Sequence, residues 1–190
     1  VHNNLEPALV GWLSGVVELG HYRIAQSTAN SLTTFINVIP VLLYPKFIKW
    51  NQNDPNSRTG LKLQIILGLL AIAFVGFHAF LWLGDPLIPF LYGNTFSPAS
   101  APFLILMGGK LLLVVNSVFT MEFWARKANN QPLMVMLPAG AISLTADFIF
   151  IPRYGMLAAS YIYLVTELII FLGLLTTYWF TIARPNNQKA

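Results

Sequence analysis

Long runs of apolar residues constrain this chain more than any other feature. A helix rises about 1.5 Å per residue, so about 20 apolar residues cross a hydrocarbon core of about 30 Å. Five stretches reach this length: residues 24–48, 63–84, 101–124, 132–152 and 155–183. Backbone polar groups in lipid must be hydrogen-bonded within their own segment. Each stretch is therefore predicted to be a transmembrane helix.

The composition agrees with a membrane location. Of the 190 residues, 56% are hydrophobic and only 9% are charged, whereas a soluble domain carries about 25% charged residues. Because so little charge cannot cover a water-facing surface, we predict an all-α, polytopic transmembrane helix bundle. Cysteine is absent, which excludes disulfides and thiolate metal sites.

A shorter apolar stretch, residues 9–17, precedes the five long ones and is too short to cross a membrane alone. We interpret it as the end of a helix that begins further upstream, and the chain starts with Val1 rather than Met. The expected architecture is a single bundle over residues 1–190, with five complete spans and one truncated N-terminal span. The chain is expected to be part of a longer protein.

Basic residues fall between the apolar stretches and mainly on one predicted side of the membrane. If connections alternate sides, one side carries these residues: Lys46, Lys49, Arg58, Lys62, Arg126, Lys127, Arg184 and Lys189. The other side carries Arg23 and Arg153, together with a predicted outer loop at residues 84–100. The positive-inside rule places the first group and the C-terminus in the cytoplasm. It also explains the formal charge of +4 without nucleic-acid binding, whose usual footprints are missing.

The segment FIFIPRYGMLAAS, residues 148–160, separates the last two stretches. Pro152 cannot continue the helical hydrogen-bond ladder, and Gly155 allows the backbone to reverse. Three small residues follow and let helices approach closely: Ala158, Ala159 and Ser160. We predict a tight antiparallel hairpin at the outer membrane surface.

Several ionisable residues fall within the predicted spans. Lys110 and Glu167 lie near the middle of the third and fifth stretches, and Asp147 lies in the outer part of the fourth. Such residues are costly in lipid and usually face a bundle interior or a watery cavity. Three interpretations of Lys110 and Glu167 stay open: a structural pair, a substrate or coupling-ion role, and lipid-facing snorkelling. Glu122 and Arg126 are one helical turn apart, which predicts a local ion pair at the interface.

Polar residues recur along the first stretch at steps of four, three, four and three: Arg23, Ser27, Asn30, Thr34 and Asn37. At helical spacing they share one face, which we call the polar stripe. Such a face either hydrogen-bonds to a neighbouring helix or lines a wet cavity, and five residues in register favour the cavity. Pro40 and Pro45 follow on the same stretch and predict a kink or hinge below the stripe.

No motif of a metal centre or of a nucleophilic catalyst is found. His2, His21 and His78 are scattered without metal-ligand spacing. Gly108 and Gly109 precede Lys110, but in a membrane span such a pair indicates close helix packing more often than a phosphate loop. We therefore expect no metal, no cofactor and no enzymatic activity.

Three segments carry a family resemblance. LIPFLYGNTFSPASAPFLIL, residues 87–106, contains Leu-Tyr-Gly with a nearby Phe, and FIFIPRYGMLAASYIYLVTE, residues 148–167, contains an Ile-Pro-x-Tyr-Gly hairpin followed by small residues. ELGHYRIAQS, residues 18–27, is similar to a Gly-x-Tyr-x-x-Ala entry to a central helix. In their order and spacing these segments resemble the C-terminal part of the polysaccharide biosynthesis family. These are the oligosaccharide flippases of the superfamily that also holds multidrug and toxic-compound exporters.

The resemblance implies the second bundle of a transporter whose two bundles rock about a central cavity. Its implied substrate is a polyprenyl-diphosphate-linked oligosaccharide, moved across the bacterial inner membrane for cell-surface polysaccharide synthesis such as O-antigen or capsule. The implied partners are this lipid-linked oligosaccharide, membrane lipids and the N-terminal lobe of the same protein.

The expected residue roles follow from the need to carry a polar head group across the hydrocarbon core of the membrane. The polar stripe would bind sugar hydroxyls, mainly through Asn30, Thr34 and Asn37, with Ser27 beside them. Arg23 or Lys110 would bind the diphosphate. Glu167 or Asp147 would bind a coupling proton or cation.

Three other functions stay open. A multidrug or cation exporter of the same superfamily would be expected to have a more apolar and acidic cavity. A polytopic membrane glycosyltransferase or polymerase would need clustered acids or bases in a large outer loop, and residues 84–100 hold only Asp85. A purely structural role in assembly is the third.

Overall fold

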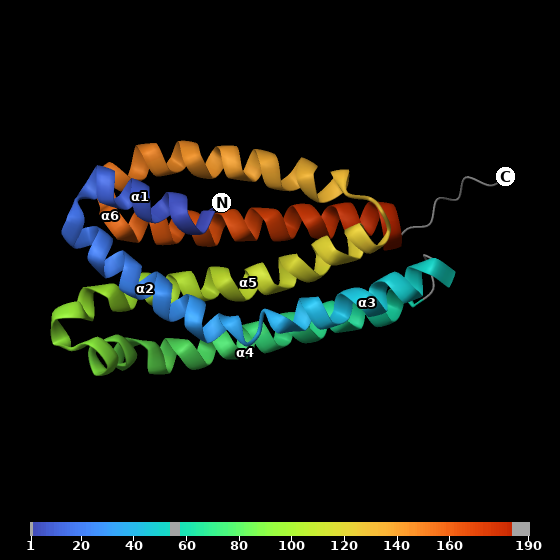
Figure 1. Ribbon diagram of the computed structural model, residues 1–190, viewed down its shortest axis with the longest axis horizontal. Coiled ribbons are helices and arrows are strands. Elements are labelled where there is room, and N and C mark those ends of the chain that lie inside the picture. The colour runs from blue at the N-terminus through green and yellow to red at the C-terminus, as the bar shows by residue number, and fades with distance from the viewer. Residues whose placement is uncertain (1, 54–57, 184–190) are drawn as a thin grey trace.

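The structure is a computed structural model that describes residues 2–53 and 58–183, and these contain helices and no strand (Figure 1). The helices are α1 His2–Ser14, α2 Val16–Thr34, α3 Val38–Asn53, α4 Thr59–Tyr92, the 3₁₀ helix η1 Asn94–Ala99, α5 Ser100–Ala125, α6 Asn130–Tyr178 and the π-helical segment η2 Trp179–Ala183. The all-α prediction is confirmed. Two of the basic residues used for the predicted sidedness, Arg184 and Lys189, lie outside the described residues.

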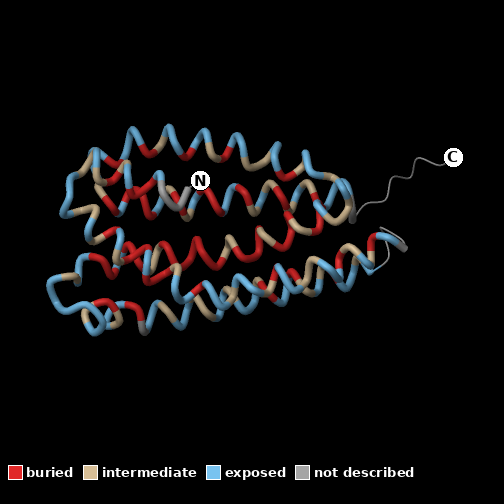
Figure 2. The backbone as a smooth tube through the Cα atoms, viewed as in Figure 1, coloured by how far each residue is buried: buried red, intermediate tan, exposed pale blue. Residues whose placement is uncertain are grey.

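Helix α5 is the centre of the bundle. It lies between α6 and α4, and α2 and α3 follow each other along it (Figure 1). Figure 2 shows buried residues along most of its length, whereas α4 is largely exposed. Because neighbouring helices cover α5 on several sides, its polar side chains must find partners on those helices.

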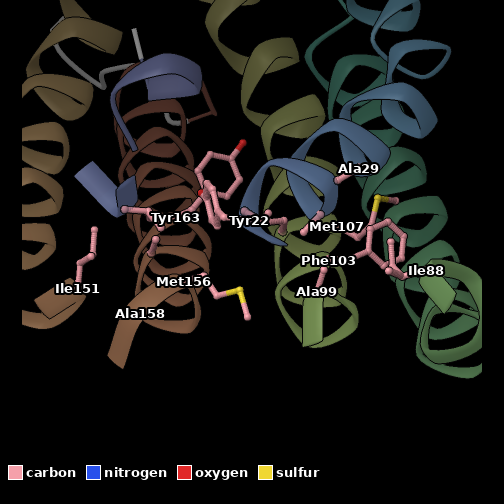
Figure 3. Packing of buried hydrophobic residues seen from close by; sticks show 14 residues of the cluster. Tyr22, Ala29, Ile88, Ala99, Phe103, Met107, Ile151, Met156, Ala158 and Tyr163 are labelled. Atoms are coloured by element: carbon pink, nitrogen blue, oxygen red, sulfur yellow. The ribbon is translucent and has the colours of Figure 1, made fainter. Parts of the chain in front are cut away.

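The apolar core consists of two clusters, one in each half of the bundle. The first includes Tyr22, Phe103, Met107 and Tyr163 (Figure 3). The second is formed by other residues, among them Phe47, Val115, Phe119, Phe123 and Tyr178. Along α5, Lys110 falls between Met107 of the first cluster and Val115 of the second. The middle of the bundle is therefore a level at which polar groups interrupt the core.

The first predicted span is broken into α2 and α3, whose axes differ by 44°. Pro40, in the first turn of α3, has no N–H to offer the Ile36 carbonyl, which instead accepts a 3₁₀-type hydrogen bond of 3.0 Å from the Ile39 N–H. The predicted kink is present, but it lies at residues 35–37, at the end of the polar stripe rather than below it. Pro45 lies inside α3.

The predicted outer loop at residues 84–100 is wrong, because this segment is almost entirely helical. Helix α4 continues through Pro86 and Pro89 to Tyr92, and η1 follows after Gly93. Pro89 cannot donate to the Asp85 carbonyl, and the Ser100 hydroxyl donates to that carbonyl instead, at 3.3 Å. A tertiary hydrogen bond thus replaces the missing helical one.

Helix α6 contains the predicted hairpin. Its backbone leaves the helical region at Gly155, with φ 57° and ψ −141°, and residues 130–154 and 156–178 form two antiparallel arms (Figure 1). The small residues predicted to allow close approach are all buried: Ala158, Ala159 and Ser160. The hairpin is therefore present, and its backbone reverses at Gly155 as predicted.

The start of α2 holds the hairpin turn in place. The Ser14 hydroxyl donates to the Ile151 carbonyl at 3.0 Å, and the Met156 N–H donates to Glu18 Oε2 at 2.9 Å. The first N–H groups of a helix have no partner within the helix, so Glu18 acts as a cap for the second arm from a distant part of the chain.

Three helical segments among the described residues are long and apolar enough to cross a membrane: Thr59–Trp82, Asn94–Ala125 and Asn130–Thr181. The bent pair α2–α3 would be a fourth. The last of the three contains both arms of α6, so five complete spans stay a prediction. Helix α1, which we expected from residues 9–17, covers His2–Ser14 and is separated from α2 by Gly15.

Most helix ends fall at two opposite ends of the bundle, whereas the start of α1 and the α2–α3 break lie partway along it (Figure 1). The C-terminal end of α3, the start of α4 and the α5–α6 connection lie at one end. The α1–α2 connection, the Gly155 turn and η1 lie at the other. This grouping is the alternation that the charge argument assumed; the cytoplasmic assignment of the first end stays a prediction.

Replacing Gly155 with Ala should lower stability by about 1–3 kcal/mol, because a non-glycine residue is strained in this backbone region. The new Cβ would also lie 2.5 Å from Glu18 Oε2. Thermal unfolding in detergent measures the effect. The control is Gly68→Ala in α4, where a Cβ meets nothing within 4 Å; equal unfolding temperatures for both variants would contradict the assigned role of the turn.

Candidate functional site

Buried polar and charged side chains from four helices gather in the middle of the bundle. We call them the buried charge cluster: Glu6 of α1, Tyr22 of α2, Lys110 of α5, and Asp147, Tyr163 and Glu167 of α6. None of them is more than 7% exposed. Glu6 and Glu167 act electrostatically on Lys110, and Glu6, Asp147 and Tyr163 act on Tyr22. Three carboxylates therefore share a region with one ammonium group.

Direct contacts link the cluster together. The Tyr22 hydroxyl donates to Glu6 Oε2 at 2.9 Å. Lys110 Nζ lies 4.9 Å from the centroid of the Tyr163 ring, within cation–π range. Asn116 Nδ2 donates to Glu167 Oε2 at 2.8 Å and to the Glu167 carbonyl at 3.0 Å, so Asn116 orients this carboxylate.

The structure brings together Lys110 and Glu167, which the sequence placed at similar depth, and buries both within the bundle. This burial argues against the lipid-facing alternative. Asp147 joins the same cluster with a fully buried side chain. Close packing explains the preceding glycines, since a Cβ at Gly109 would lie 2.6 Å from the Tyr163 ring.

Glu6 and Tyr22 were missed by the sequence analysis. A signal for Glu6 existed, because it is an acidic residue directly before the apolar residues of α1. Tyr22 is the tyrosine of the Gly-x-Tyr-x-x-Ala pattern noted in residues 18–27, but that pattern gave it no partner; its place on the buried face of α2 makes it part of the cluster.

The first four residues of the polar stripe lie on the face of α2 that points away from the core, and Asn37 lies in the break after α2. Arg23, Ser27, Thr34 and Asn37 are exposed and Asn30 is half-buried. The opposite face of α2 is buried and includes Tyr22, Ala25, Gln26, Ala29 and Thr33. The stripe is therefore not the surface that packs α2 onto α5, and the structure does not bring buried Lys110 to it.

A cavity of about 420 Å³ opens between α5 and α6. Its polar lining comes from Asn116, Ser117, Thr120, Tyr163 and Glu167. Glu167 and Tyr163 belong to both the cavity and the buried charge cluster, so the cavity offers the cluster a route toward the surface of the chain.

A second ionic site ties α3 and α4 to α5. Lys62 Nζ lies 2.9 Å from Glu122 Oε1 and donates to Asn51 Oδ1 at 2.5 Å. Asn51 Nδ2 donates to Glu122 Oε2 at 3.3 Å, and Arg126 Nε donates to Glu122 Oε1 at 2.7 Å. The predicted Glu122–Arg126 pair is confirmed, but it is not merely local, because Glu122 and Lys62 are both fully buried.

Comparison with known proteins decides the family. Residues 1–101 of the 190 match the family described as polysaccharide biosynthesis protein, which is just over half of the chain. The chain belongs to the polysaccharide biosynthesis protein family. A search of curated proteins and a search of solved structures found no match. The family resemblance inferred from sequence is confirmed.

The family match includes Glu6, Tyr22 and the polar stripe, and it ends at the start of α5. Lys110, Glu122, Asp147 and Glu167 follow beyond it. In this polysaccharide biosynthesis protein, no group of three or more His, Asp or Glu among the described residues could hold a metal ion. Family membership and the apolar helices together suggest a membrane protein with a flippase or exporter role.

Replacing Glu122 with Gln should destabilise the protein by about 3–5 kcal/mol, because it leaves two cations near each other without their buried carboxylate. Lys49→Gln, at an exposed position of α3, is the control and should change stability by less than about 0.5 kcal/mol. Thermal unfolding in detergent distinguishes the two. A Glu122 variant as stable as the control would show that this site does not hold α3 and α4 on α5.

Proposed function

We propose that this chain is one lobe of a transporter that moves a lipid-linked oligosaccharide across the membrane by alternating access. The observation that carries the proposal is the exposed polar stripe on α2, within an otherwise apolar bundle. Polar side chains at membrane depth rarely face hydrocarbon and usually line a watery cavity or contact protein. A cavity shared with the N-terminal lobe would satisfy them.

The stripe suits a substrate with a polar head. Asn30, Thr34 and Asn37 supply hydrogen-bonding groups for sugar hydroxyls, with Ser27 in the same row. Arg23, which is exposed at the start of the polar stripe, is the better candidate for binding the diphosphate. Lys110 was expected to share this role. Because it is buried among carboxylates, it is better suited to compensating their charge within the lobe than to binding the diphosphate.

The break between α2 and α3 supports alternating access. Transporters often place binding groups at discontinuous helices, because unwound backbone there absorbs a change of angle. The 44° bend follows directly after Thr34 and contains Asn37. Bending at residues 35–37 would therefore reposition the lower end of the stripe.

Glu167 and Asp147 are the proposed sites for a coupling proton or cation. Buried carboxylates within transport proteins commonly serve this purpose. Glu167 also lines the cavity between α5 and α6, which would give an ion access to it.

The proposed activity moves its substrate without chemical change, so we assign no catalytic residue and no cofactor. The proposed location is the bacterial inner membrane with a cytoplasmic C-terminus, in agreement with the positive-inside rule. The proposed partners are the lipid-linked oligosaccharide, membrane lipids and the N-terminal lobe.

The three buried carboxylates of the buried charge cluster favour a second candidate, a multidrug or cation exporter. A cationic compound would be attracted by Glu6, Asp147 and Glu167 rather than by the stripe. Vesicles containing the full-length protein, offered either a lipid-linked oligosaccharide or a fluorescent organic cation, separate the two functions.

Single cysteines at Asn30, Thr34 and Asn37 should react with a membrane-impermeant thiol reagent in the full-length protein, because the proposed cavity is wet. Residues 1–190 contain no cysteine, so each label reports one site once any cysteine in the rest of the full-length protein has been replaced. Ala29→Cys, on the buried face of α2, and Ile72→Cys, exposed on α4, are the unreactive controls. If cysteines at the stripe positions were as unreactive as Ile72→Cys, the proposed cavity would be wrong.

Lys110→Ala and Glu167→Gln should each lower oligosaccharide transport by about tenfold or more, which corresponds to about 1.4 kcal/mol. The physical reason is the loss of charge balance in one variant and of the ion-binding carboxylate in the other. Transport is measured in vesicles with equal amounts of folded protein. Undiminished transport in both variants would remove the ion-coupling assignment.

A further inference from the structure

One aromatic ring lies beside the polar stripe and is left uncovered by the rest of the lobe. Phe35, which directly follows α2, is 83% exposed. It comes four residues after Ser31, which comes four residues after Ser27, so the three side chains are neighbours along one side of the helix. All three are exposed. Phe35 therefore ends a row that runs alongside the polar stripe and shares Ser27 with it.

The backbone around Phe35 offers hydrogen-bond acceptors because the helix is broken there. The Ile36 N–H donates to the Thr33 carbonyl at 3.1 Å, and the Ile39 N–H donates to the Ile36 carbonyl at 3.0 Å. Both are 3₁₀-type bonds, whereas an α-helix would direct the same N–H groups to the carbonyls of Leu32 and Phe35. Those two carbonyls therefore lose their usual donors at the break and become acceptors for a ligand.

A sugar ring presents two kinds of surface, a face of C–H groups and an edge of hydroxyls. The polar stripe serves the hydroxyls only. An aromatic ring packs against C–H groups through dispersion and excludes water from them. Binding sites for small molecules commonly combine aromatic side chains with a few well-placed polar groups. The end of α2 combines both, since the Phe35 ring lies between Thr34 and Asn37 in the sequence.

Contact with lipid alone does not account for this neighbourhood. An exposed phenylalanine is ordinary where a helix faces hydrocarbon, and Phe90 of α4 is 84% exposed. Phe35 differs because exposed polar side chains stand next to it, those of Ser31, Thr34 and Asn37. Such groups are costly in hydrocarbon, which favours a polar ligand with an apolar face.

We propose that Phe35 is a sugar-binding residue of the transporter, whose ring stacks on the C–H face of one sugar unit of the substrate. The carbonyls of Leu32 and Phe35 accept hydrogen bonds from hydroxyls of the same unit. The inference rests on the proposed transport function and adds to it the contact that recognises the glycan rather than its lipid carrier. It also places this contact at the break that bends during alternating access.

The test uses the full-length protein in vesicles and the polyprenyl-diphosphate-linked oligosaccharide extracted from cells that produce it. Phe35→Leu keeps an apolar side chain but removes the ring. It should raise the half-saturating concentration by about three- to tenfold, the effect of losing one aromatic contact. The maximal rate should stay unchanged, because the lost contact is made on binding. Phe35→Trp keeps an aromatic ring and should retain the parent's half-saturating concentration.

Phe90→Leu is the matched control, because Phe90 is equally exposed but lies on α4, and it should behave as the parent does. Polyprenyl diphosphate without a glycan, added as an inhibitor, should inhibit the parent and Phe35→Leu at the same concentration. An unchanged half-saturating concentration in Phe35→Leu, an equal rise in Phe35→Trp, or weaker inhibition by the glycan-free lipid in Phe35→Leu overturns the inference alone. Absence of oligosaccharide transport by the parent overturns the proposed function, and this inference with it.

Discussion

The burial of polar groups on α5 is the constraint on which the rest of this structure depends. Lys110, Asn116 and Glu122 lie on a helix that its neighbours cover, and each is at most 3% exposed. A buried charge or amide without partners costs several kcal/mol. Partners must therefore come from helices distant in sequence: Glu6 and Glu167 act on Lys110, Glu167 accepts from Asn116, and Lys62 pairs with Glu122. Satisfying α5 thus determines which helices surround it.

The two ionic sites along α5 differ in a way that separates structure from function. At Glu122, one carboxylate is held by Lys62, Arg126 and Asn51; the bonds from Lys62 and Asn51 attach α4 and α3 to α5, and the bond from Arg126 lies at the end of α5 itself. In the buried charge cluster, carboxylates outnumber the single ammonium group and a cavity reaches Glu167. A carboxylate held by two cations and an amide suits a fixed attachment, whereas a buried carboxylate that lines a cavity is the better candidate for the proposed exchange of a proton or cation.

Sequence reasoning was most accurate where the signal is a property of one segment. Hydropathy located the apolar helices, and the period of the stripe placed four of its five residues on one face of α2, with Asn37 in the break that follows. The Gly155 hairpin followed from local backbone chemistry. Sequence reasoning failed at residues 84–100. Prolines normally end helices, but here the Ser100 hydroxyl replaces the N–H that Pro89 lacks. Sequence reasoning also placed the kink at the prolines, although the carbonyl that lacks its helical donor belongs to Ile36, four residues before Pro40.

The sequence alone determined that this chain forms apolar helices with a polar face, since hydropathy and helical period act over neighbouring residues. Only the tertiary structure decided which buried groups meet. Asn51 reaches Glu122 across 71 residues of chain, and Glu18 caps Met156 across 138. Such contacts depend on how whole helices pack against one another, and no local pattern encodes that arrangement. For the same reason Glu6 and Tyr22 became candidates only once α1 and α2 were seen beside α5 and α6.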